Sequence, residues 1–169
     1  RGLDVCAYIV EKVSGSRFSD FLNKEIFVPL QMKDTGFYLN EEQVKRLVIA
    51  YQPSKDGKHI IPSTLERLVK PPLGKFTPGP SGGLISSAQE MGRNYQMLLN
   101  GGELDGKRII LETSAKKIRQ SQTGENKAGF VPGSAWGLGF GLVQQPEGVS
   151  AMLNEGSCGH GGAFGTQGW

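Results

Sequence analysis

The sequence predicts an α/β (α+β) protein in which helices come first and strands follow. Apolar residues recur at helical spacing near the start of the chain. Over 136–143, by contrast, large residues alternate with glycine, which is the period-2 pattern of a strand. The 169 residues are enough for one domain, which if complete would bury roughly 70% of its unfolded surface.

The first predicted helix covers residues 3–13. Its apolar stripe consists of Leu3, Cys6, Ile9, Val10 and Val13. Gly15 is a natural terminator for this helix, and Ser16 is predicted to cap a second helix that Pro29 ends. The buried stripe of the second helix is predicted to contain Phe18, Phe21, Leu22 and Ile26. Because Cys6 lies on the apolar face, we expect its small thiol to be buried.

The middle of the chain is less regular. Residues 30–37 are typical of a structured turn, packed by Leu30, Met32 and Phe37. Asn40 with Gln43 has the pattern of a capping box that opens a short helix through Leu47. Residues 52–80 are rich in proline and glycine, so we expect an irregular stretch with one hairpin turn at 55–58.

The second half begins with another capping signal, in which Ser87 and Glu90 form a Ser-x-x-Glu box. The helix that it opens is expected to end at Gly101-Gly102. Its inward residues are predicted to be Met91, Tyr95, Leu98 and Leu99. After it we expect a turn at Asp105-Gly106, a short basic helix over 112–120, a strand over 136–143 and a last strand that starts near His160.

Composition excludes several classes of partner. The net charge is only +3 and the basic residues are scattered, so we expect no nucleic-acid partner. The longest apolar runs are too short to span a bilayer, so no transmembrane segment is expected in this region. Cys6 and Cys158 show no zinc-ligand spacing, and neither a metal nor another cofactor is expected. Two cysteines make no disulfide framework, and whether they pair stays open.

The segment Gly159-His160-Gly161-Gly162 carries most of the chemical information. A polar residue followed by small residues on a strand lets a ligand lie against the backbone, where free N–H groups can point at a developing oxyanion. The competing interpretation is a glycine-rich edge strand or turn with an incidental histidine.

Five segments occur in an order that is familiar from one group of enzymes. They are residues 6–15, 26–37, 81–102, 136–143 and 159–169. Together they resemble the serine β-lactamase superfamily. In order, they are similar to its helix after a Tyr-x-Asn motif, its Pro-Leu-Gly-Met-x-x-Thr segment and its Gly-Gly-Leu-x-Ser-Thr helix. The last two segments are similar to two strands of its sheet. The similar branch holds class C β-lactamases, D-Ala-D-Ala carboxypeptidases and β-lactamase-fold esterases. Gln31 stands where this family usually has glycine.

The resemblance implies a β-lactamase/transpeptidase-like fold, an antiparallel sheet flanked by helices, present here only as a partial domain. Residues 1–169 would then be the C-terminal part of a single β-lactamase-like serine hydrolase domain. Arg1 is not an initiator methionine and Trp169 falls within the predicted last strand, so we interpret the chain as a segment of a larger protein. The resemblance alone favours a periplasmic or secreted location.

The family transfers acyl groups with a Ser-x-x-Lys nucleophile, a Tyr-x-Asn tyrosine and a third motif on a strand. The resemblance makes His160-Gly161-Gly162 the third motif, in its His-x-Gly form. His160 would help hold the polar network and the substrate, and Gly161 and Gly162 would leave room for the substrate. The backbone N–H of Ala163 would be an oxyanion donor. The expected partner is a small-molecule or peptide-like acyl substrate.

Three other matches are interpreted as coincidental. With 13 serines and 12 lysines in the chain, about one Ser-x-x-Lys is expected by chance, and Ser114 falls on the predicted basic helix. Tyr38-Leu39-Asn40 fits Tyr-x-Asn, but Asn40 is better explained as a helix cap. His59 lies in a turn-rich stretch and is expected to be exposed. The nucleophile is therefore expected upstream of Arg1.

Two functions remain open at this stage. The first is an active serine hydrolase that acts on an ester, amide or β-lactam bond. The second is a non-catalytic ligand-binding or sensor protein on the same fold. The His-x-Gly form occurs among carboxypeptidases and esterases, which argues against efficient β-lactam hydrolysis. Residues 52–80 and 127–134 are expected to rim the site.

Overall fold

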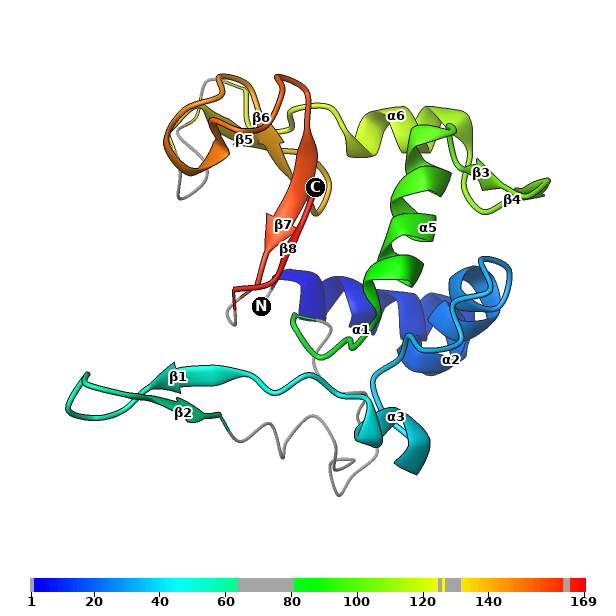
Figure 1. Ribbon diagram of the computed structural model, residues 1–169. Helices are drawn as coiled ribbons and strands as arrows, with labels where there is room; N and C mark the ends of the chain where they lie inside the picture. Colours follow the sequence, from blue (N-terminus) through cyan, green and yellow to red (C-terminus); the bar gives the residue numbers. More distant parts are fainter. Residues whose placement is uncertain (1, 64–80, 125, 127–131, 163–164) are drawn as a thin grey trace. The chain divides into compact units, whose positions relative to one another are not determined.

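The computed structural model describes residues 2–63, 81–124, 126, 132–162 and 165–169. The chain consists of two compact units, Arg1–Gly92 and Arg93–Trp169 (Figure 1). The first unit is mainly helical, and the second holds a four-stranded antiparallel sheet. This mixture of helices and an antiparallel sheet agrees with the predicted fold class.

Helix α1 (Gly2–Ser14) ends where the sequence predicts, because Gly15 adopts φ +69° and donates its N–H to the Glu11 carbonyl. Helix α2 (Phe18–Leu22) continues directly into a π-helical turn, η1 (Asn23–Phe27). The predicted Ser16 cap is wrong. The Phe18 N–H donates instead to the Glu11 carboxylate of α1 at 2.8 Å, which satisfies a free donor at the helix start without a serine.

Most of the core of the first unit comes from the end of η1 and the turn that follows it. Its buried side chains are Phe27, Leu30, Met32 and Phe37, which confirms the predicted packing of the 30–37 turn. The apolar stripe of α1 is largely exposed, by contrast, with Leu3 at 54% and Val13 at 83%. Cys6 is exposed as well, and the expectation of a buried thiol is wrong because only Ala7 of this helix is buried.

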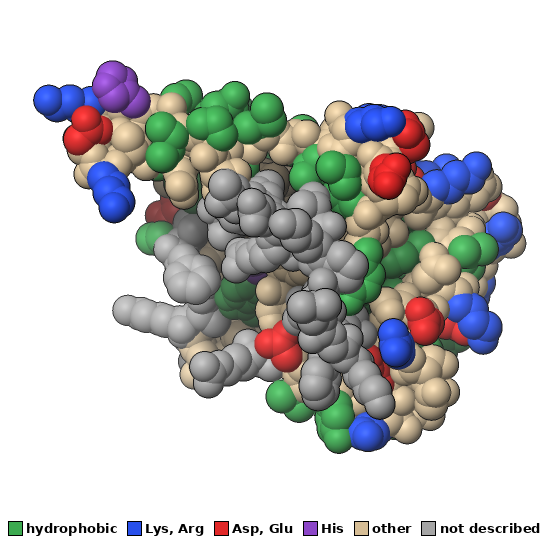
Figure 2. Space-filling model, turned by 90° about the horizontal axis from the view of Figure 1, so that it is seen from below, with side chains coloured by type: hydrophobic (Ala, Val, Ile, Leu, Met, Phe, Trp, Pro, Cys, Tyr) green, Lys and Arg blue, Asp and Glu red, His purple; other side chains and the backbone are tan. Residues whose placement is uncertain are grey.

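The predicted capping box at Asn40 is confirmed. Asn40 and Gln43 exchange side-chain to backbone hydrogen bonds, both of 2.9 Å, at the start of α3 (Glu41–Lys45). The chain then forms a hairpin of β1 (Tyr51–Pro53) and β2 (Ile60–Pro62), with the predicted turn between the strands. Charged side chains gather at its tip, and apolar side chains lie along its exposed strands (Figure 2). Residues 64–80 of the predicted irregular stretch lie outside the described residues.

Helix α5 (Ala88–Leu99) begins at the predicted cap, where the Glu90 N–H donates to the Ser87 hydroxyl at 3.3 Å. Of its predicted inward residues, Leu98 is confirmed as buried, Met91 and Tyr95 are half-buried, and Leu99 is wrong. Met97 and Leu98 are buried, while Leu99 is 63% exposed. The helix stops at Gly101-Gly102, as expected, because these glycines adopt φ +71° and +95°. A side chain at Gly102 would also overlap the Ile110 carbonyl oxygen.

Strands β3 (Glu103–Leu104) and β4 (Lys107–Arg108) flank the predicted turn, in which Asp105 and Gly106 both have positive φ. Positive φ at both central residues is what a two-residue hairpin turn of type I′ requires, and Asp-Gly supplies it. Helix α6 (Glu112–Ile118) follows and confirms the predicted basic helix.

The four-stranded sheet has the order β5-β6-β7-β8, and every neighbouring pair is antiparallel. Its strands are β5 (Ser134–Trp136), β6 (Gly141–Val143), β7 (Cys158–Gly161) and β8 (Gln167–Gly168). A 3₁₀ turn, η2 (Gly148–Ser150), lies between β6 and β7. Strand β7 therefore has neighbours on both sides: β6 pairs with Cys158 and Gly159, and β8 pairs with His160 and Gly161.

The two long strands predicted here are each a hairpin. Residues 136–143 turn at Gly139, which adopts φ +86°, and Gly137 donates its N–H to the Phe140 carbonyl. The last eleven residues fold likewise, with β7 and β8 on either side of a turn that includes Gly165 at φ +79°. Glycine fits a period-2 strand and a tight turn equally well, so the alternation alone does not distinguish them.

Candidate functional site

His160 lies within β7 and pairs across the sheet with Gly168 of β8. Its imidazole is exposed, and the indole of Trp136 packs against it with ring centroids 5.4 Å apart and an interplanar angle of 59°. Trp136 falls in the predicted strand over 136–143, and the sequence pattern indicates no role for it. The signal that could have found it is a large aromatic residue opposite a glycine in a strand pair.

The imidazole also contacts its own backbone. His160 Nδ1 lies 2.5 Å from the carbonyl oxygen of Gly161, which is within hydrogen-bond distance. A ring contact and a backbone hydrogen bond thus act on one side chain, and together they restrict the directions in which its second nitrogen can point.

Glycine allows the close packing around β7. A Cβ at Gly159 would overlap the Gly168 carbonyl oxygen and would lie 2.7 Å from Trp169 Cα. A Cβ at Gly168 would overlap the hydroxyl of Tyr95, which projects from α5. The Tyr95 ring packs edge-on against Phe140 with centroids 6.3 Å apart, so α5 supports the sheet beside the residue that pairs with His160.

Tyr95 and Cys158, which lie beside the sheet, both have a raised pKa. Partial burial raises the pKa of Tyr95, and negative charge on the nearby Cys158 would raise it further. Partial burial likewise raises the pKa of the Cys158 thiol, and Arg119 opposes this shift. Both groups are therefore neutral near pH 7, which suits a supporting role beside the sheet better than a nucleophilic one.

The other predicted site residues follow His160 directly. A Cβ at Gly161 would meet the Gln167 side-chain nitrogen at 2.9 Å, and one at Gly162 would overlap the Thr166 hydroxyl. Both neighbours are side-chain ends that rotation can move. Ala163, whose N–H is the predicted oxyanion donor, lies outside the described residues. The roles of Gly161, Gly162 and Ala163 thus remain predictions.

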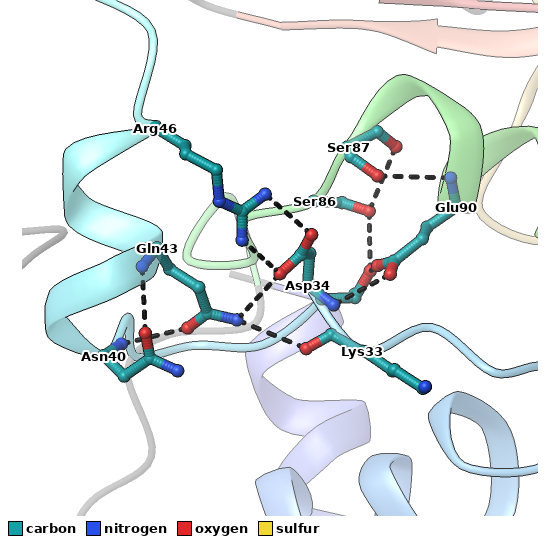
Figure 3. Close-up of polar contacts among 9 residues, drawn as sticks. Lys33, Asp34, Asn40, Gln43, Arg46, Ser86, Ser87 and Glu90 are labelled. Atoms are coloured by element: carbon teal, nitrogen blue, oxygen red, sulfur yellow. Dashed lines mark hydrogen bonds and ion pairs between the residues drawn. The ribbon is translucent and has the colours of Figure 1, made fainter.

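A second polar cluster lies in the first unit, where α5 meets the 34–36 turn (Figure 3). The Glu90 side chain is nearly buried, with the residue 8% exposed. Its carboxylate accepts the Asp34 N–H at 2.8 Å and the Thr35 hydroxyl at 2.5 Å. The Thr35 hydroxyl also lies 2.7 Å from that of Ser86. The predicted capping box at 87–90 is therefore only half formed, because Glu90 is engaged with a segment more than 50 residues away.

A cleft of about 280 Å³ lies beside this cluster. Its polar wall includes Asp34, whose carboxylate is held by Arg46 and Gln43. The Arg46 guanidinium, followed by Gln43, holds the pKa of the Asp34 carboxyl below its usual range. These side chains satisfy one another across the cleft, so the arrangement ties α3 to the 34–36 turn (Figure 3).

The matches interpreted as coincidental have the surroundings expected of them. Ser114 is exposed on α6, where Lys116 pairs with Glu112 at 2.7 Å. Asn40 caps α3, and His59 is exposed at the end of the β1–β2 turn. Among the described residues, no group of three or more His, Cys, Asp or Glu side chains could hold a metal ion. Nor is any helix in the described ranges long and apolar enough to cross a membrane.

Comparison with known proteins gives this geometry a context. A sequence model of the Beta-lactamase family matches residues 2–169. Protein Rv1367c of Mycobacterium tuberculosis is 27% identical over 177 residues, which cover 97% of this chain and 43% of that protein. The chain therefore spans less than half the length of this curated relative.

Solved structures show the same fold. EstCE1, described as a hydrolase with promiscuous acyltransferase activity, matches 98% of this chain and 45% of its own length, with a TM-score of 0.75 and 21% identity. The octameric penicillin-binding protein homologue from Pyrococcus abyssi matches 94% of this chain and 31% of its own length, with a TM-score of 0.63 and 22% identity. The predicted β-lactamase/transpeptidase-like fold is confirmed.

Proposed function

Because the chain belongs to the beta-lactamase family, we propose that it is the C-terminal part of a serine hydrolase domain that works through a covalent acyl-enzyme. The nucleophilic serine, its lysine and the tyrosine of the Tyr-x-Asn motif would come from a part of the protein that precedes this chain. The chain's contribution is the third motif, in which His160 borders the substrate and Gly161 and Gly162 admit it.

One observation carries the proposal. His160 lies on an inner strand of the sheet with two restraints on its ring, the Trp136 indole and the Gly161 carbonyl. These two contacts hold an exposed polar side chain in one geometry, at a cost in conformational entropy. A preorganised polar group beside a glycine strand is what an acyl-transfer site uses to orient a substrate.

The substrate class follows from the motif. A histidine in place of the lysine of Lys-Thr-Gly provides no permanent positive charge for the carboxylate of a β-lactam. We therefore propose an ester or peptide-like amide as the preferred substrate, over a β-lactam. The N–H of Ala163 would donate to the oxyanion, a kind of contact whose loss costs on the order of 10²–10³ in rate.

The decisive experiment labels the full-length protein with a fluorophosphonate and, separately, with a fluorescent penicillin. Mass spectrometry then locates any adduct. We expect an adduct on a serine that precedes this chain, formed more slowly in the His160→Ala variant. The matched control is His59→Ala, which removes the other histidine and should label at the normal rate. A folded protein that forms no adduct would instead have the non-catalytic ligand-binding role.

The chain by itself provides a second test. It should hydrolyse no ester, because we place the nucleophile and its base outside it. Hydrolysis of p-nitrophenyl acetate by the isolated chain that disappears in Ser114→Ala would contradict the proposal, since it would assign the nucleophile to α6.

A further inference from the structure

The contact between His160 and Gly161 determines which imidazole nitrogen carries the proton. A carbonyl oxygen can only accept a hydrogen bond, so the Nδ1 atom that lies 2.5 Å from it must be the donor. A neutral imidazole carries one proton. With Nδ1 protonated, Nε2 keeps its lone pair and can only accept.

The Trp136 indole lies where it can keep the ring in this orientation. In the sheet register Trp136 is opposite Gly141, and Gly141 is opposite Gly159, the residue before His160. Only Gly141 lies between Trp136 and the His160 strand in this row, and it has no side chain. A Cβ at Gly141 would already be only 3.4 Å from the Gly159 carbonyl oxygen, so the row across the sheet is closely packed. The indole itself contacts the imidazole of the next residue, His160, at 5.4 Å between centroids.

We propose that Trp136 is a positioning residue, which packs against the His160 ring and holds it as the Nδ1–H tautomer, so that Nε2 acts as a hydrogen-bond acceptor in the site. The inference rests on the proposed function, because it assigns a task to His160 within the acyl-transfer site. It adds the direction of the hydrogen bond. His160 Nε2 would accept a hydrogen bond from a donor such as a hydroxyl of the substrate or of a catalytic side chain.

This direction has a consequence for substrate choice. A lysine at the same position only donates hydrogen bonds, and it attracts a carboxylate. An imidazole that presents a bare Nε2 repels a carboxylate lone pair and favours a substrate with a hydroxyl or amide N–H at that position. The tautomer thus favours neutral acyl substrates over substrates with a carboxylate next to the reacting carbonyl.

The test is a measurement of the tautomer by NMR, made on the full-length protein labelled with [15N]histidine and without any substrate. The His160 signals are assigned by their loss in His160→Gln, and those of the exposed His59 by their loss in His59→Gln. Recorded at a pH above the imidazole titration, the two nitrogens of each ring have different shifts, and the couplings to ring protons identify the protonated one. We expect Nδ1–H for His160 and the free-imidazole mixture, mainly Nε2–H, for His59.

Substitutions of Trp136, with one control at Tyr8, test the part played by the indole. Trp136→Phe keeps an aromatic ring and should keep the Nδ1–H signature, whereas Trp136→Leu should shift His160 to the free-imidazole mixture that His59 shows. Tyr8→Leu removes an exposed aromatic ring from α1 and should leave the His160 signals unchanged. Trp136→Met, which is unbranched, replaces Trp136→Leu if the leucine variant fails to fold.

Labelling by fluorophosphonate separates this inference from the proposed function. We expect Trp136→Leu to slow adduct formation by up to about 10²-fold, the scale for misplacing a catalytic group by about 1 Å, and Trp136→Phe to slow it little. An Nε2–H signature for wild-type His160, or an unchanged signature in Trp136→Leu (or in Trp136→Met where it replaces the leucine variant), would overturn the inference even if the protein forms an adduct. Absence of an adduct with the Nδ1–H signature intact would overturn the proposed function alone.

Discussion

The two units of this chain hold their segments together by opposite means. In the first unit, the Glu90 carboxylate reaches across more than 50 residues of sequence to Asp34 and Thr35. In the second unit, β7 and β8 approach because Gly159 has no side chain to meet the Gly168 carbonyl oxygen. A side-chain bond can be weakened in steps, whereas a close backbone approach tolerates no added atom, so the two regions should respond differently to substitution.

The largest effect is expected where the backbones meet. In Gly159→Ala the new methyl group would overlap the Gly168 carbonyl oxygen, and rotation of a side chain cannot relieve a clash with backbone. We expect a loss of about 3 kcal/mol in the free energy of unfolding, measured by urea denaturation of the full-length protein. The matched control is Gly92→Ala on α5, where a Cβ meets nothing within 4 Å. There the better helix former should add about 1 kcal/mol.

Weakening the hydrogen bonds of Glu90 should cost less stability than Gly159→Ala. In Glu90→Gln the amide keeps the shape but replaces one acceptor by a donor, so the Asp34 N–H and the Thr35 hydroxyl can no longer both be satisfied as they are. We expect a loss of about 2 kcal/mol, the usual range for a hydrogen bond to a buried charge.

Thr35→Val should cost less than Glu90→Gln, and the double variant should cost less than the sum, because the two residues share one bond. Glu155→Gln, on an exposed residue, is the control for loss of a carboxylate. Strict additivity of Glu90→Gln and Thr35→Val would contradict the picture of a shared network, and with it the comparison between the two units.

The same contrast explains what the sequence could predict. Local signals were sufficient for α1 with its Gly15 terminator, for the Asn40 box and for the Asp105-Gly106 turn, because each depends on residues a few positions apart. The partner of Glu90 could not be predicted, because the pattern Ser-x-x-Glu is identical whether the glutamate caps its own helix or binds a distant turn.

Glycine was ambiguous for a related reason. The alternation in 136–143 predicted one strand, and the structure has a hairpin, because glycine suits both. His160 could be selected from the sequence since polar residues are rare between glycines. Trp136 could not be assigned to it, because the contact crosses a strand of the sheet and depends on the register.

A smaller effect is expected at Gln31, where the first unit has a residue in a conformation that glycine prefers. Gln31 adopts φ +56°, a left-handed conformation that costs an L-residue about 1–2 kcal/mol. Gln31→Gly should therefore raise the free energy of unfolding by about 0.5–1 kcal/mol once the greater flexibility of the unfolded glycine is subtracted. Gln96→Gly in α5 should lower it by up to about 1 kcal/mol. Destabilisation by both variants would show that the Gln31 side chain has a contact that outweighs its strain.

The smallest effect is expected at the exposed edge of the polar cluster. There the contributions of the Asp34 main chain and side chain to stability can be measured separately. Asp34→Asn keeps the N–H that Glu90 accepts and removes only the charge that pairs with Arg46. Arg46 lowers the pKa of Asp34 in the folded protein, so the pair stabilises the fold above the pKa of an unfolded aspartate, and this contribution is lost as the pH falls through the lowered value. The difference in urea midpoint between wild type and Asp34→Asn should therefore be small and constant from pH 7 to about pH 5 and should vanish in stronger acid. Glu112→Gln, which breaks a more exposed pair with Lys116, should show a dependence in the same direction. A difference at Asp34 that persists in acid would mean that the charge is not what the side chain contributes, and that the amide disturbs the bond between its own backbone and Glu90.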